Sequence, residues 1–326
     1  MCTRAMWRTG GGEVLVGRNM DWLKDMKTNL WALPAGIERD GLIPGGLSWR
    51  ARFGSVVATA YDIATSDGVN DAGLAAHLLW LAESDYGHRD PALPGLAPSV
   101  WAQYFLDNFA TVAEAVAFLA ETPVQIVPQT DPFSGQEVTV HLALDDVSGD
   151  SAIVEYVAGS PEVHHSPSFN VMTNSPPFEQ QLEHLARFQG FGGDAPLPGT
   201  TEAADRFVRA AYYVERLPEP ESSREAVAEI LSVMRNASQP FGTVDPARPN
   251  ISATIWRTVS HLTDGLYLFE SAFRPNVVWA RIGALALSEG QPARKLDLNG
   301  DPDLVGDVTD SFQPSDPFKF VAPAAA

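Results

Sequence analysis

The residue with the most distinctive chemistry in this 326-residue chain is its one cysteine, Cys2, directly behind the first methionine. Because residue 2 is small, we expect Met1 to be removed, which leaves a thiol and a free α-amine on the same residue. A free thiol is only a few per cent ionised at neutral pH, whereas an α-amine titrates at about 7.7–8.0 and can accept the thiol proton. Cys2 could therefore supply both nucleophile and base. The alternative is that it is only a small residue in an edge strand.

Two charged residues can act on Cys2 if the first twenty residues form a hairpin. Arg18 and Asp21 then close the second strand, opposite the start of the first. A guanidinium would favour the thiolate, and a carboxylate would hold the α-amine by a charge-assisted hydrogen bond. A surface ion pair at the strand end is the other interpretation.

Two later segments carry further candidates. Asn174 follows a short strand and precedes Pro176, so its amide could donate to a developing oxyanion or only stabilise the turn. A helix predicted over 201–214, with Thr200 or Thr201 as its N-cap, carries Arg206 and Arg209. Either arginine could reach a buried site, although arginines on helices often belong to surface ion-pair networks.

The elements that must position these residues follow one another along the chain in the order strands, two helices, strands, helices and strands. Helices segregated from hairpin-connected strands indicate an α+β layered fold rather than a βαβ sheet. Thr111 before Glu114 fits a capping box. The hydrophobic pattern predicts strands over 2–7, 13–19, 53–61, 74–79, 138–144, 151–157, 164–173, 252–261, 265–271 and 277–282, and helices over 100–109, 112–120, 178–188, 201–214 and 224–235.

The composition excludes several classes of protein. With 22 Lys and Arg against 41 Asp and Glu, the net charge of −19 argues against nucleic-acid and anionic-membrane partners. One cysteine excludes an internal disulfide and a multi-thiolate metal site. The chain lacks the dinucleotide fingerprint, the P-loop, G-x-S-x-G and H-E-x-x-H. We find no apolar leader and no membrane-length apolar run, so we expect a cytoplasmic protein.

Metal ligands are weakly suggested at two places. The segment 297–303 has oxygen ligands at alternate positions but carries Pro302 where a calcium loop needs glycine, so an acidic surface loop is the simpler interpretation. His164 and His165 point to opposite faces of a strand and cannot hold one ion together. We expect no metal and no cofactor.

The ordered set of motifs resembles the choloylglycine hydrolase family, N-terminal-nucleophile amidases that include bile salt hydrolases and penicillin V acylases. The resemblance implies a four-layer αββα sandwich over one domain, 1–326, with a loop-rich tail at 297–326. It also implies Cys2 as nucleophile, its amine as base, and a homotetramer. The resemblance further implies that Cys2 acts together with Arg18, Asp21, Asn174 and Arg206. The matching segments are 1–4 (MCTR), 17–22 (GRNMDW), 29–31 (NLW), 68–75 (GVNDAGLA), 172–176 (MTNSP) and 206–210 (RFVRA).

One departure from the family pattern lies at Trp80. Many bile salt hydrolases carry Asn there and some penicillin V acylases Tyr, whereas Trp looks like the Gram-negative-type subgroup, similar to penicillin V acylases that also cleave acyl-homoserine lactones. An indole cannot reproduce the geometry of an amide, so we expect a backbone N–H of residue 80 or 81 to complete the oxyanion hole. The stretch between Asn174 and Arg206 is short, which predicts a smaller arm between subunits.

The predicted function is therefore hydrolysis of a linear amide outside peptide bonds, as in a penicillin V acylase, with acyl-homoserine lactones as possible further substrates. Trp22, Trp31 and Trp80 are expected to shape an apolar pocket for the acyl group of a small-molecule substrate, with core packing as the alternative role for each. One alternative function is a conjugated bile salt hydrolase with a steroid-sized pocket. An alternative of another class is a non-catalytic acidic binding protein in which Cys2 is incidental.

Overall fold

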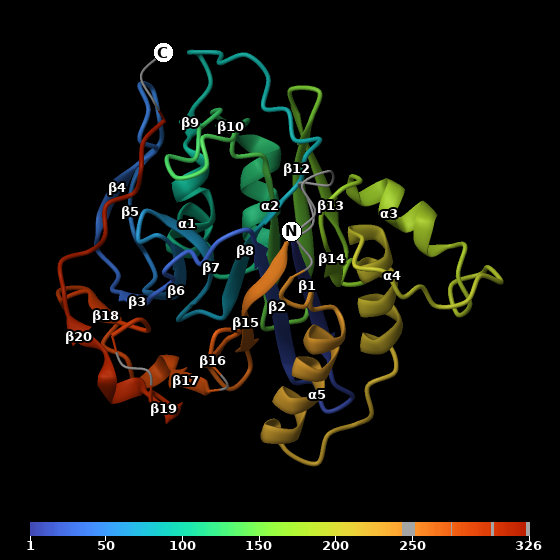
Figure 1. The fold of residues 1–326 in the computed structure, drawn as a ribbon. Helices are drawn as coiled ribbons and strands as arrows, with labels where there is room; N and C mark the ends of the chain where they lie inside the picture. Colours follow the sequence, from blue (N-terminus) through green and yellow to red (C-terminus); the bar gives the residue numbers. More distant parts are fainter. Residues whose placement is uncertain (243–251, 275, 301–302, 324–326) are drawn as a thin grey trace.

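The computed structural model describes residues 1–242, 252–274, 276–300 and 303–323. Within these ranges two large, mostly antiparallel β-sheets face each other, and helices cover the outer face of each sheet (Figure 1). The predicted αββα four-layer arrangement is confirmed. No helix in the described ranges is long and apolar enough to span a bilayer.

The first sheet is built around the N-terminal hairpin. Strand β1 (Cys2–Arg8) pairs antiparallel with β2 (Val14–Trp22), with Cys2 opposite Met20 and Arg4 opposite Arg18. The seven strands run in the order β14-β1-β2-β15-β16-β17-β19. The other members are β14 (Val171–Met172), β15 (Ala253–His261), β16 (Leu266–Ser271), β17 (Val277–Arg281) and β19 (Gly306–Asp307).

The second sheet has nine strands in the order β13-β12-β11-β8-β7-β6-β3-β18-β20. Its strands are β3 (Leu30–Leu33), β6 (Ser55–Ala60), β7 (Ala64–Asn70), β8 (Leu74–Trp80), β11 (Val140–Asp146), β12 (Ser151–Val157), β13 (Ser160–His165), β18 (Arg294–Leu296) and β20 (Gln313–Pro314). Shorter pieces are β4 (Glu38–Asp40), β5 (Ser48–Arg50), β9 (Gly95–Leu96), β10 (Gln125–Ile126), η1 (Ile282–Ala284) and η2 (Thr309–Ser311).

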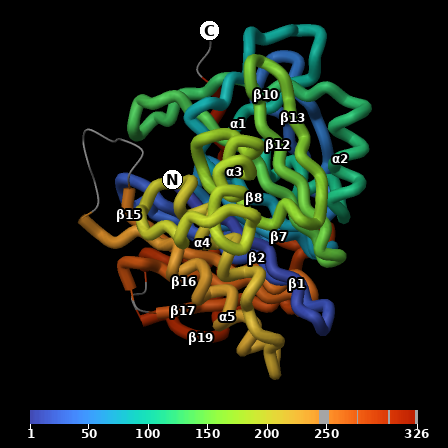
Figure 2. Tube along the Cα trace, turned by 90° about the vertical axis from the view of Figure 1, so that its right-hand side faces the viewer, coloured from blue at the N-terminus to red at the C-terminus, as the bar shows by residue number. Residues whose placement is uncertain are grey.

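The helices divide between the two outer faces. Helices α1 (Pro98–Asn108) and α2 (Val112–Glu121) cover the nine-stranded sheet, and α4 (Ala203–Val214) and α5 (Ser223–Asn236) cover the seven-stranded sheet. The short helix α3 (Phe178–Leu185) packs beside α4. Figure 2 shows the N-terminus of the chain next to α4, which brings the start of β1 under that helix.

Most predicted elements are present, and one local signal is confirmed directly. The Oγ1 atom of Thr111 accepts the Glu114 N–H at the start of α2, and the Glu114 carboxylate accepts the Ala110 N–H. Two predictions are wrong. Residues 164–173 form no single strand, because the chain turns at 166–170 from β13 in one sheet to β14 in the other. The N-cap of α4 is Glu202 rather than Thr200 or Thr201, and Thr200 Oγ1 accepts the Glu202 N–H instead.

Candidate active site

Cys2 lies at the first position of β1, buried where the two sheets meet. Its Sγ atom is 3.6 Å from Met20 Sδ and 3.9 Å from Arg18 Nη2. The same thiol lines the wall of an apolar cavity. The thiol is thus buried beside a guanidinium and faces a cavity that a substrate could enter.

The guanidinium of Arg18 is held rigidly beside the thiol. Nη1 donates to the Ser66 carbonyl and Nη2 to the Leu78 carbonyl, each at 2.5 Å. The guanidinium also stacks over the Trp256 ring, 5.0 Å from its centroid. Asp67 supplies the balancing charge, with Oδ1 3.3 Å from Arg18 Nη1. These contacts hold the two terminal nitrogens of Arg18 and place Nη2 beside Cys2.

Asp67 belongs to a buried polar cluster between the sheets. Its carboxylate contacts His77 Nδ1 and Tyr267 Oη, each at 2.5 Å, and Thr258 Oγ1 at 3.0 Å. Burial alone would raise the pKa of Asp67, but His77 and Arg18 hold it well below its ordinary value. Burial lowers the pKa of His77. Asp67 is therefore ionised, and its charge offsets that of Arg18.

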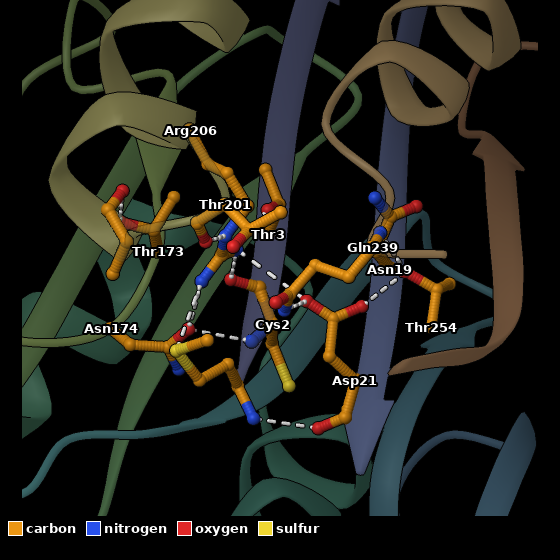
Figure 3. Close-up of polar contacts among 12 residues, drawn as sticks. Cys2, Thr3, Asn19, Asp21, Thr173, Asn174, Thr201, Arg206, Gln239 and Thr254 are labelled. Carbon is orange, nitrogen blue, oxygen red and sulfur yellow. Dashed lines mark hydrogen bonds and ion pairs between the residues drawn. The ribbon is translucent and has the colours of Figure 1, made fainter. Parts of the chain in front are cut away.

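The backbone nitrogen of Cys2 is held from the opposite side of the site (Figure 3). This N–H donates to Asn174 Oδ1 at 2.6 Å, and Arg206 Nη2 donates to the same oxygen at 2.8 Å. Arg206 Nη1 donates to the Cys2 carbonyl and to Thr3 Oγ1, each at 2.5 Å. Burial lowers the pKa of Arg206. Asn174 and Arg206 thus fix the position of the Cys2 nitrogen. Arg209 bonds instead to the carbonyls of Pro198 and Thr200.

Asp21 contacts this cluster through its side chain, and its predicted bond to a free Cys2 amine stays a prediction. Its carboxylate accepts from Thr254 Oγ1 at 2.6 Å and Gln239 Nε2 at 2.8 Å, and lies 3.6 Å from Arg206 Nη1. Met1 is attached in this structure, so the Cys2 nitrogen is an amide and forms its bond with Asn174. The Met1 ammonium donates to the Asp21 carbonyl at 2.6 Å, and burial lowers its pKa.

The side-chain and backbone donors predicted for the oxyanion hole can be compared in the structure. Asn174 Nδ2 donates to the Trp80 carbonyl at 2.6 Å, which leaves the second hydrogen on that nitrogen free to turn to a ligand. The Leu81 N–H donates to the Thr139 carbonyl across the sheet. In an antiparallel strand the N–H and C=O of one residue point to the same side, so the Trp80 N–H shares the strand edge that faces Asn174. Of the two predicted backbone donors, the geometry favours Trp80.

The cavity in front of Cys2 holds about 820 Å³ of empty space, including its open mouth. Trp22 and Trp80 both line it, with ring centroids 5.7 Å apart and planes tilted by 50°. Trp31 does not, which corrects the prediction: its indole N–H donates to Asp62 Oδ1, and its ring packs against Phe318 in the core under α1. Further lining residues include Met20, Met26, Ala60, Tyr61, Leu78, Val138 and Val140.

Several contributors to the site were absent from the sequence-based prediction. Met20, the closest sulfur neighbour of Cys2, could have been found from the register of the predicted hairpin. Asp67 carries no such signal, because it lies between Ser66 and Gly68 in a polar segment whose pattern does not predict a strand. Gln239 and Thr254 have no local signal, because only the tertiary fold brings them to Asp21.

One group of described residues has metal-ligand chemistry. Glu13, His261 and Asp264 meet at the end of β2 away from Cys2, with His261 Nε2 3.3 Å from Glu13 Oε1 and 3.6 Å from Asp264 Oδ2. His261 Nδ1 accepts the Asp264 N–H. Glu13 is half-buried and Asp264 is exposed, and exposed acidic groups are common without a metal ion. The acidic segment 297–303 includes two residues, 301 and 302, outside the described ranges.

Comparisons with known proteins agree with this geometry. Residues 2–301 match the family model described as linear amide C–N hydrolases, choloylglycine hydrolase family. The chain is 43% identical to a penicillin V acylase of Pectobacterium atrosepticum, over 94% of this chain and 88% of that one. The structure of penicillin V acylase from Agrobacterium tumefaciens superimposes with a TM-score of 0.91 and 46% identity, covering 98% of this chain and 100% of that one.

Relatives at lower identity are named as enzymes that act on bile salts. A bile salt hydrolase/transferase of Bifidobacterium longum subsp. longum is 25% identical over 72% of this chain and 80% of that one. A conjugated bile acid hydrolase from Clostridium perfringens has a TM-score of 0.79 at 19% identity, covering 92% of this chain and 97% of that one, and shares the fold.

Proposed function

The chain belongs to the choloylglycine hydrolase family of linear amide C–N hydrolases, and from that premise we propose that Cys2, freed of Met1, cleaves its substrate with its own α-amine as the base. The observation that carries this proposal is the setting of Cys2. Its thiol opens on the cavity beside Arg18, while its nitrogen is fixed by Asn174 and Arg206.

The reaction would proceed through a thioester. The α-amine takes the thiol proton, and Sγ attacks the acyl carbon of the amide. The amine then returns the proton to the leaving nitrogen as the C–N bond breaks. The same amine then deprotonates a water molecule that attacks the thioester carbon; the C–S bond breaks, the proton returns to Sγ, and the acid is released.

The other residues hold these two reacting groups. Arg18 favours the thiolate, and Asp21 lies on the amine side of Cys2 through its contact with Arg206. Asn174 Nδ2 and the Trp80 N–H are placed to donate to the oxyanion of the tetrahedral intermediate. Such donors contribute roughly 10²–10³ in kcat in known enzymes.

A penicillin V acylase-like substrate range is favoured over bile salts. Identity to the penicillin V acylases is 43–46% over nearly the whole chain, against 25% for the Bifidobacterium bile salt relative. The tilted pair Trp22 and Trp80 gives the cavity flat apolar walls, which suit an aryl or alkyl acyl group. Acyl-homoserine lactones share that apolar acyl part. The family membership argues against the alternative of a non-catalytic binding protein.

Parallel turnover measurements test this proposal. Wild type and Cys2→Ala are incubated with penicillin V, a long-chain N-acyl-homoserine lactone and glycocholate, and release of the free amine is followed. We expect the wild type to cleave penicillin V with higher kcat/KM than glycocholate, and Cys2→Ala to cleave none. Cleavage of glycocholate alone would instead support the bile salt hydrolase alternative.

Three broader features stay predictions. The first is that the chain acts as one domain, and the second is that it resides in the cytoplasm. The third is a homotetramer in which the short segment between α3 and α4 provides a small arm between subunits.

A further inference from the structure

The C-terminal segment of the described chain is fixed at Val321 by three hydrogen bonds. Its N–H donates to the Ile63 carbonyl at 2.9 Å. Its carbonyl accepts from Ser99 Oγ at 2.7 Å and from Gln129 Nε2 at 3.0 Å. Ser99 and Gln129 are both buried, and they also bond to each other through the Ser99 N–H. This backbone position is therefore held as firmly as one in a sheet, although it lies in no strand.

Aromatic contacts anchor the same segment just upstream. Phe318 packs against Trp31, with ring centroids 5.3 Å apart, and against Phe320 at 4.6 Å. The guanidinium of Arg39 lies over the Phe320 ring. These contacts explain what Trp31 does in this fold: it is a support for the tail rather than a wall of the cavity.

Val321 lies on the cavity that begins at Cys2. It lines the cavity together with its three partners Ile63, Ser99 and Gln129. Ser66, whose carbonyl holds Arg18 beside the thiol, lines it too. Ile63 is the last residue of the turn that precedes β7, three residues before Ser66. Figure 1 shows the end of the described chain well apart from the N-terminus, so Val321 lines a part of the cavity away from the nucleophile, where the far end of an acyl chain would lie.

We propose that Val321 sets the length limit of the acyl group, so that the C-terminal tail is a specificity determinant of this enzyme. The inference rests on the proposed function, in which the acyl group occupies this cavity. Replacing valine by alanine removes two methyl carbons from the end wall and makes room for about two further methylenes of a chain. Burying each methylene contributes about fourfold in affinity, so chains one or two methylenes beyond the wild-type limit gain roughly fourfold to sixteenfold.

Binding of straight-chain carboxylic acids, the class of product that the reaction releases, tests this inference without catalysis. Acids of increasing length are titrated by calorimetry into wild type, Val321→Ala, Val321→Phe and the matched control Val305→Ala, whose side chain is 67% exposed and lies outside the cavity. We expect Val321→Ala to bind acids one or two methylenes longer than the wild-type limit roughly fourfold to sixteenfold more tightly. Val321→Phe should weaken long acids by a similar factor and leave short ones unchanged. Val305→Ala should match the wild type.

The result that overturns the inference is an unchanged dependence on chain length in both Val321 variants, or wild type that binds no acid at all. Thermal unfolding of each variant shows which proteins are folded. If Val321→Phe is not folded, Val321→Ala alone is used for the test. Penicillin V turnover by the same wild-type preparation separates the two proposals. If the wild type cleaves penicillin V but the Val321 variants keep the wild-type length limit, only the role of Val321 is refuted. If the variants shift the length limit but the wild type does not cleave penicillin V, only the proposed reaction is refuted.

Discussion

Asn174 has two functions in the proposed mechanism, and its two side-chain atoms separate them. Oδ1 accepts from the Cys2 nitrogen and from Arg206, so it positions the nucleophilic residue. Nδ2 faces the Trp80 carbonyl and supplies the donor for the oxyanion. A carboxylate at this place would keep the acceptor and lose the donor.

The variants Asn174→Asp and Asn174→Ala use that difference. If Nδ2 donates to the oxyanion, both variants lose roughly 10²–10³ in kcat, with a smaller change in KM. Steady-state kinetics with penicillin V provide the measurement. Near wild-type kcat in Asn174→Asp would show that only the acceptor atom matters and would remove Asn174 from the oxyanion hole.

At the scale of elements, the contact between β2 and β7 depends on one buried charge pair. Arg18 on β2 and Asp67 on β7 are both fully buried, and the other contacts of Asp67 are neutral or weakly basic groups. Removing one partner of such a pair leaves an uncompensated charge in the core. Asp67→Asn should therefore lower the free energy of unfolding by about 3–5 kcal/mol.

Urea unfolding of Asp67→Asn, followed by tryptophan fluorescence, measures that loss. Asp25→Asn is a matched control, since Asp25 forms a surface pair with Lys27 and should change stability by less than about 1 kcal/mol. Equal stabilities of the two variants would contradict the structural importance assigned to Asp67.

A second carboxylate joins β12 to helix α3. Glu155 accepts from His141 Nδ1 at 2.8 Å and from the Phe178 N–H at 3.0 Å, at the first turn of α3. Burial would raise the pKa of Glu155, but hydrogen bonds from His141, His164 and Phe178 lower it to about 2 from an ordinary 4.5. Because the folded state holds this proton less tightly, the stabilisation is present above pH 4.5 and is lost as the pH falls toward 2.

The glutamine variant of this residue isolates the effect. Between pH 6 and pH 3 the wild type should lose more stability than Glu155→Gln, by an amount on the order of 2 kcal/mol, because the amide does not titrate. Urea unfolding at the two pH values gives the loss of stability between pH 6 and pH 3 for each protein. Parallel losses in the two proteins would show that Glu155 is not responsible for the acid sensitivity.

At the scale of the molecule, the layered fold follows from local signals more fully than the site does. The predicted hairpin fixes the approach of Arg18 to Cys2, since paired strands bring residues 16 positions apart together. Asn174 and Arg206 are 172 and 204 positions from Cys2, and no periodicity relates them. Only the family resemblance placed these two beside the nucleophile before the structure did.

The incorrect predictions also have physical causes. Trp31 lies in β3, a strand of four apolar residues that are all buried, so its sequence does not say which face borders the cavity and which the core under α1. Strand β7 was not predicted because its sequence, ATSDGVN, is polar, and its Asp67 is satisfied by partners on other strands. Strand β14 is only two residues long and joins the other sheet, and the prediction of one strand over 164–173 ran through the turn at 166–170 that separates it from β13.

The homotetramer is a prediction at this largest scale. Light scattering coupled to size-exclusion chromatography should give a mass four times that of the 35.2 kDa chain. Because the arm between α3 and α4 is short, we expect dissociation at lower urea concentration than unfolding requires. A mass equal to one chain at micromolar concentration would contradict the prediction.

The central claim, that Cys2 without Met1 is the nucleophile and its amine the base, is tested most directly by mass spectrometry of the working enzyme. Active protein is quenched in acid during turnover of penicillin V, digested, and its N-terminal peptide is sequenced. The account predicts a peptide that begins at Cys2 and carries the acyl group as a thioester on Sγ. Fully active protein that retains Met1, or an acyl group attached to another residue, would contradict it.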